Sequence, residues 1–129
     1  EIPEAWRVRS PYSVAQAKSV CSELLSEHRG VTALICGNDI IAQGAMSSAM
    51  QLGLRIPQDL SIVGIGDFAG SADMYPALST VQIPAQKIGA QAGQYLVESI
   101  ANSDATEIVR RKIEVALKPR ATTGQAVCG

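Results

Sequence analysis

The sequence predicts an α/β domain, a parallel sheet with flanking helices, and three observations support this fold class. Short apolar runs alternate with longer segments whose apolar residues recur every three or four positions, as in buried strands and amphipathic helices. Strands that alternate with helices form parallel sheets through right-handed crossovers. The 129 residues, 47% of them hydrophobic, are enough for one core and too few for two ordinary domains.

Capping signals mark the expected helix boundaries. Ser13 and Asn38 each precede a segment of helical periodicity, where a side-chain oxygen can accept a backbone N–H. Gly30 and Gly53 follow the ends of these two segments, and Pro84 opens a third. The apolar run between Gly30 and the second helix predicts a strand covered on both faces. In chain order we expect a helix over 14–28, a strand over 31–36, a helix over 40–52, a strand over 60–65, an extended segment over 78–83, a helix over 85–101 and a strand over 113–117.

The charge balance argues against DNA binding by this chain alone. Eleven Lys and Arg residues oppose twelve Asp and Glu residues, for a formal net charge of −1. Binding to duplex DNA needs a cluster of basic residues that displaces counterions from the phosphates. The one basic run, Arg110 to Lys112, is better explained as charges that guard the start of an apolar strand.

Several site classes are not expected. Cys21, Cys36 and Cys128 are odd in number and have no paired spacing, so we expect no metal site, no disulfide and a reducing cytoplasm. The loop from Gly64 to Gly70 has one residue too many for a dinucleotide-binding GxGxxG motif, and His28 has no nucleophile motif beside it. We therefore expect neither a cofactor nor an enzyme.

We also expect that the chain does not contact a membrane and that it is a piece of something longer. No apolar stretch approaches the length of a membrane span, and no signal peptide is present. The chain opens in mid-pattern at Glu1, without an initiator methionine.

Two polar loops, which we call the polar corners, follow predicted strands and indicate a ligand site. The first is Gly37–Asp39, after the strand over 31–36, and the second is Gly66–Asp67, after the strand over 60–65. Ligands of open α/β sheets bind at the carboxyl ends of the strands, and both corners would open onto that edge. An aromatic ring packs on the C–H face of a sugar, while amides and carboxylates bond its hydroxyls. An alternative stays open: Asn38 would only cap a helix and Tyr12 would only cover the core, and for Asp39 the spacing favours capping. The candidate ligand-binding residues are Tyr12, Asn38, Asp39, Gly66 and Asp67.

The second predicted helix carries an apolar band wider than one face. Ile40, Met46 and Met50 extend a stripe that already suits the sheet. A broad core contact or a subunit interface would each explain this width.

Five stretches of the sequence carry a family resemblance by their order and spacing. They are Thr32–Asp39, Ala42–Ala45, Gly53–Gly64, Pro76–Val81 and Arg120–Thr123. Together they resemble the LacI/GalR family of transcription repressors.

The resemblance implies a periplasmic-binding-protein-like fold of type I, with an effector in the cleft between two subdomains. Residues 1–77 and 113–129 would form the carboxy-terminal subdomain, and the helix 85–102 would belong to the amino-terminal one. That helix would have lost its packing surface here, so we expect it to be mobile, swapped or covered by another copy. A helix-turn-helix headpiece that binds operator DNA would lie outside this chain.

The resemblance also assigns residues. The family's stacking aromatic matches Tyr12, and its ligand-binding asparagine matches Asn38. Effector binding would shift the subdomains and control DNA binding allosterically across a homodimer. The homodimer contacts carried over from the family are Met46, Met50, Met74 and Tyr75.

One departure from the family pattern bears on the effector. Many members have a double acid where this chain has Gly66 and Asp67, so the first carboxylate is missing. Its loss removes like-charge repulsion toward an anionic ligand, and gluconate-type repressors resemble this pattern. The hypothesis is a sugar or sugar-acid effector. The alternatives are a periplasmic sugar-binding protein of a transporter and a Rossmann-type enzyme.

Overall fold

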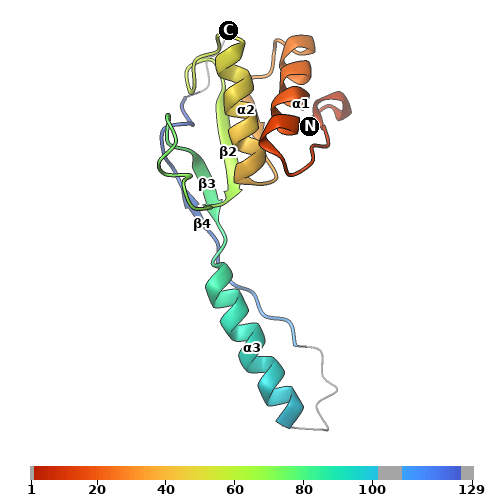
Figure 1. The fold of residues 1–129 in the computed structure, drawn as a ribbon, viewed down its shortest axis with the longest axis vertical. Helices are drawn as coiled ribbons and strands as arrows, with labels where there is room; N and C mark the ends of the chain where they lie inside the picture. Colours follow the sequence, from red (N-terminus) through yellow and green to blue (C-terminus); the bar gives the residue numbers. More distant parts are fainter. Residues whose placement is uncertain (1, 102–108, 126–129) are drawn as a thin grey trace.

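The computed structural model describes residues 2–101 and 109–125, which form one sheet, two helices packed together and a third helix that projects away (Figure 1). The predicted order of helices and strands is confirmed. The elements are η1 (Glu4–Trp6), α1 (Val14–Glu27), β1 (Ala33–Ile35), α2 (Asp39–Gln51), β2 (Ser61–Gly66), β3 (Ser79–Gln82), α3 (Ala85–Ala101) and β4 (Ala116–Lys118). Cys128 lies outside the described residues.

The sheet has the strand order β1-β2-β3-β4. The pairs β1–β2 and β2–β3 are parallel, as expected, whereas β4 runs antiparallel to β3. The sheet is therefore mixed, because β3 leads out to α3 and the chain returns along β3 as β4 without crossing over. This last strand covers 116–118 and not the expected 113–117.

The core lies between α2 and the inner face of the sheet, with α1 packed against α2. Gly44 allows the two helices to approach, because a Cβ at this position would lie 2.5 Å from the Cβ of Ala17 and 2.7 Å from the carbonyl oxygen of Val14. Leu60, Ile62 and Leu78 are completely buried beneath α2. The buried cluster consists of Cys21, Leu25, Val31, Cys36, Ala42, Ala45, Met46, Ala49, Leu60, Ile62 and Leu78.

The second helix is capped as predicted and the first is not. The N–H of Ile41 donates to Asn38 Oδ1 over 2.9 Å, and Gly53 follows the helix with φ +73°. Ser13 precedes α1, but its side chain makes no capping hydrogen bond. Gly30 does not adopt the left-handed conformation; α1 ends at Glu27, and the N–H of the next residue, His28, donates to the carbonyl oxygen of Leu24.

The prediction that the first strand is covered on both faces is wrong. Leu34 faces the core, but Ile35 is 79% exposed. Within the described ranges, helix packing covers only the inner face of β1, so the apolar side chains of its outer face remain in contact with solvent.

The third helix makes no core contact. None of its residues is buried, and Leu96, Val97 and Ile100 are largely exposed. Figure 1 shows α3 extending from the sheet, with the returning chain beside it. A hollow of about 220 Å³ lies between the two and is lined by Ile88, Gln91, Ala92, Tyr95, Val109, Arg111 and Ile113. The assignment of α3 to a second subdomain stays a prediction.

None of the helices in the described part of the chain combines the length and the apolar character that a bilayer crossing requires.

Candidate functional site

The two polar corners lie side by side at the carboxyl edge of the sheet. Ile35, the last residue of β1, pairs with Val63 of β2, and β2 continues to Gly66, so the loops that follow the two parallel strands leave the same edge of the sheet. A direct contact joins the corners, since the N–H of Phe68 donates to Asp39 Oδ2 over 2.8 Å. Asn38, Asp39, Gly66 and Asp67 are thereby brought together, as the sequence predicted.

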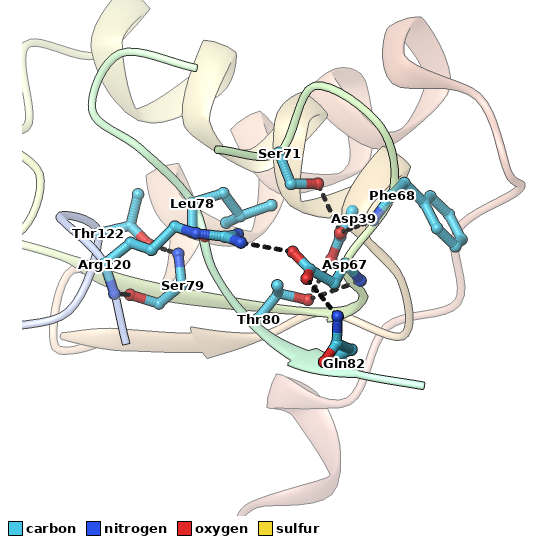
Figure 2. A network of polar contacts seen from close by, with 10 residues as sticks. All are labelled: Asp39, Asp67, Phe68, Ser71, Leu78, Ser79, Thr80, Gln82, Arg120 and Thr122. Carbon is cyan, nitrogen blue, oxygen red and sulfur yellow. Dashed lines mark hydrogen bonds and ion pairs between the residues drawn. The ribbon is translucent and has the colours of Figure 1, made fainter. Parts of the chain in front are cut away.

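Asp39 points inward and organises this edge (Figure 2). Besides the Phe68 N–H, its carboxylate accepts hydrogen bonds from the hydroxyls of Ser71 and Thr80, each over 2.6 Å. The residue is only 1% exposed. Gly64 makes room for it, because any side chain at that position would collide with the Asp39 carboxylate. Both Asp39 oxygens are therefore used inside the protein.

Asp67 is held by a part-buried ion pair. Arg120 donates to Asp67 Oδ1 over 2.6 Å, and the Gln82 amide donates to Oδ2 over 3.1 Å. The same guanidinium also donates to the carbonyl oxygen of Leu78 over 2.8 Å. Asp67 itself has a left-handed backbone, with φ +54°. The second carboxylate of the corner pair is thus neutralised and fixed in place.

The carboxy-terminal segment places Arg120 in the site. The hydroxyl of Thr122 accepts from the N–H of Ser79 over 2.8 Å and donates to the carbonyl oxygen of Ile62 over 2.7 Å. The N–H of Arg120 bonds to the Ser79 hydroxyl over 2.8 Å. Since Thr122 is completely buried, this segment is anchored against β2 and β3.

The groups left for a ligand are an amide and aromatic rings. Asn38 is half-buried, and its Oδ1 caps α2, while its amide nitrogen makes no hydrogen bond within the described ranges. Tyr12 is 77% exposed just ahead of α1, and Phe68 is 45% exposed. No contact among the described residues joins Tyr12 to either corner. The arrangement offers hydrogen-bond donors and apolar faces, without a free carboxylate.

A separate hollow of about 530 Å³ lies at the opposite edge, by the amino ends of β1 and β2. It is lined by Leu25, Ser26, His28, Arg29, Val31, Thr32, Leu52, Leu54, Arg55, Gln58 and Asp59. The side chain of Arg55 donates two hydrogen bonds of 2.6 and 2.7 Å to the Asp59 carboxylate, and the backbone N–H of Arg55 donates a third over 2.8 Å. These bonds lower the pKa of Asp59 to about 2.

The two described cysteines are buried free thiols. Burial raises the pKa of Cys36 to about 12, with smaller contributions from Cys21 and Asp39, and burial also raises the pKa of Cys21. Neither thiol is in the reactive thiolate form at neutral pH.

The expected dimer residues differ in exposure. Met46 is buried in the chain's own core, and Met74 is partly buried against it. Met50 and Tyr75 are 52% and 94% exposed. The interface stays a prediction, and Met50 and Tyr75 are the two that a partner could reach most directly.

Sequence reasoning missed several residues of the network, namely Phe68, Ser71, Thr80, Gln82, Arg120 and Thr122. Thr80 and Thr122 carry one usable signal, because each is a hydroxyl next to apolar residues and buried hydroxyls need partners. Arg120 could not be assigned to Asp67 from spacing, since the two lie 53 positions apart.

The fold is that of an α/β domain built on a largely parallel sheet, and its polar edge lies where ligands of such folds bind. The chain belongs to the periplasmic binding protein-like domain family, whose model matches residues 2–123, and within it to the LacI/GalR effector-binding domains.

Named relatives support this placement. The chain is 33% identical over 102 residues to the HTH-type transcriptional repressor PurR of Escherichia coli, covering 79% of this chain and 30% of PurR. A LacI family transcriptional regulator from Mycobacterium smegmatis is 32% identical, with a TM-score of 0.79 over 94% of this chain and 45% of that one. The CelR–cellobiose complex is 24% identical, with a TM-score of 0.87 over 95% of this chain and 37% of CelR, and shows the fold. The chain thus spans about a third of the length of the curated relatives that it matches.

Proposed function

We propose that this chain is the effector-sensing and dimerisation part of a cytoplasmic LacI-type transcription regulator that binds a sugar or sugar acid. The observation that carries the proposal is the pairing of the Asn38 corner with the Gly66–Asp67 corner at the carboxyl edge of a parallel sheet. Ligands of open α/β folds bind at this edge. Relatives named as repressors and regulators support the same class.

A sugar derivative suits the groups at this edge. The Asn38 amide can donate to a hydroxyl or carboxylate oxygen, and the ring of Tyr12 offers an apolar face to C–H groups. The charge of Asp67 is balanced by Arg120, and both oxygens of the buried Asp39 are occupied by internal donors, so neither carboxylate offers a free acceptor to a sugar hydroxyl. A sugar acid such as a hexonate is the preferred effector.

The proposed mechanism is a population shift. Effector bound at the carboxyl edge favours one arrangement of two subdomains, and this change alters how a homodimer presents its DNA-binding segments to an operator. Met46, Met50, Met74 and Tyr75 are the proposed dimer contacts. A DNA-binding segment outside this chain would contact the operator, as the name HTH-type repressor indicates for PurR.

A ligand titration with a matched pair of variants tests the site. In the full-length gene product, Asn38→Asp keeps a side-chain oxygen that can cap α2 but removes the amide donors. We expect D-gluconate to bind at least tenfold more weakly, because a hydrogen-bond donor is replaced by a charge of the same sign as the ligand's. The control is Gln43→Glu, the same chemical change at an exposed position of α2. Equal binding by both variants would remove Asn38 from the site.

A gel shift separates the proposed regulator from a periplasmic sugar-binding protein. The full-length gene product should retard specific fragments of a genomic DNA library, and effector should change that binding. A protein that binds sugar but never retards this DNA would support the transport alternative and contradict the regulator.

A further inference from the structure

Gly66 and Phe68 form a matched pair at the end of β2. Gly66 has φ +131°, a conformation that L side chains rarely adopt, and a Cβ placed there would collide with the edge of the Phe68 ring. The aromatic ring therefore lies over the place where a side chain at position 66 would begin. The space in which a carboxylate side chain at position 66 would begin is therefore not empty, because the phenyl ring of Phe68 covers it.

The backbone beneath this ring is fixed on both sides. The N–H of Phe68 is bonded to Asp39, and its carbonyl oxygen accepts from the N–H of Ser71 over 3.0 Å. The preceding residue, Asp67, is pinned by Arg120. Figure 2 shows the ring of Phe68 pointing away from this polar network. Since the ring is 45% exposed, it offers a held apolar surface to a ligand.

We propose that Phe68 is a specificity-determining residue of the effector site, which packs its ring on the C–H face of a carbohydrate acid. This inference rests on the function proposed above. A carboxylate at position 66 would accept hydrogen bonds from hydroxyls and repel an anion. The Phe68 ring does neither. A carboxylate at position 66 would favour neutral polyols, whereas the ring favours ligands that have an apolar face and carry their negative charge elsewhere.

The pairing of the two residues is tested by stability, independently of any ligand. Gly66→Ala, Phe68→Ala and the double variant form a double-mutant cycle, measured by chemical denaturation. Gly66→Ala should destabilise the protein, and the loss should be clearly smaller when residue 68 is already Ala, because the collision with the ring is gone. Equal losses in both backgrounds would overturn the pairing, since only the backbone strain at residue 66 would then remain.

The ligand role is tested by calorimetric titration of the full-length gene product with D-gluconate and with D-glucitol, its open-chain neutral match. Phe68→Ala should weaken gluconate binding about five- to tenfold. Phe68→Tyr, which keeps the ring, should restore most of the affinity, and Phe68→Leu, which keeps only apolar volume, should not. Gluconate binding that is unchanged in Phe68→Ala would overturn this inference and leave the proposed function intact. Failure of every sugar and sugar acid to bind the unmodified protein would overturn both.

Discussion

Thr80 and Asp39 lock the third strand to the start of α2, since the Thr80 hydroxyl donates to Asp39 Oδ1 over 2.6 Å. Both residues are buried, and the contact spans 41 positions of the chain. It joins the first polar corner to the strand that follows the second. The candidate site is thus built on elements that the protein's own polar network holds in place.

Removing the Asp39 carboxylate should lower the free energy of unfolding by far more than the loss of one hydrogen bond would. Asp39→Ala leaves three donors without their acceptor in a buried place, so we expect a loss of about 3–5 kcal/mol in the free energy of unfolding. Thr80→Val is nearly isosteric and removes one donor, with an expected loss of about 1–3 kcal/mol. Urea denaturation of the two variants measures both. A loss under about 1 kcal/mol for Asp39→Ala would contradict the central position of this carboxylate.

The ion pair between Arg120 and Asp67 should depend on the shape of the guanidinium. Lysine keeps the charge but cannot reach Asp67 and the Leu78 carbonyl together, as Arg120 does. We expect Arg120→Lys to destabilise the protein by about 1–2 kcal/mol and to weaken gluconate binding as the Gly66–Phe68 turn loosens. Arg29→Lys, the same change at an exposed arginine, is the control and should leave stability unchanged. Full stability in Arg120→Lys would show that charge alone is sufficient.

Gly44 provides a test in which packing opposes helix propensity. Alanine favours a helix by about 1 kcal/mol over glycine, yet at residue 44 its methyl group would press on the backbone of α1. We expect Gly44→Ala to lower the free energy of unfolding by about 1–3 kcal/mol. Gly89→Ala in α3 meets nothing within 4 Å and should raise the helix signal in circular dichroism. A stabilised Gly44→Ala variant would contradict the close approach of α1 and α2.

The raised pKa of the Cys36 thiol predicts that the protein loses stability at alkaline pH. Its pKa is raised from 9.0 to about 12, so the folded protein holds this proton where the unfolded chain releases it. The stabilising contribution is complete below pH 9 and is lost as pH rises from 9 toward 12, by up to about 1.4 kcal/mol per pH unit. Denaturation midpoints at pH 8, 9 and 10 should fall less in Cys36→Ala than in the unmodified chain. If the midpoints of the two proteins fall equally with pH, the raised pKa of Cys36 is contradicted.

The sequence predicts what depends on local periodicity. The order of the elements, the cap at Asn38, the turn at Gly53 and the meeting of the two corners all follow from apolar spacing and from the parallel sheet. It did not predict that Asp39 would accept three internal donors, because Ser71 and Thr80 reach it only through the tertiary fold. The antiparallel β4 and the exposed face at Ile35 depend likewise on which surfaces are packed together.

Ligand-induced protection from hydrogen exchange tests most directly whether effector binds at the carboxyl edge of the sheet. The measurement compares the full-length gene product with and without saturating D-gluconate. We expect slower exchange in the peptides that contain residues 37–41 and 66–71. Protection confined to residues 52–59, beside the hollow at the opposite edge, would contradict binding at the carboxyl edge.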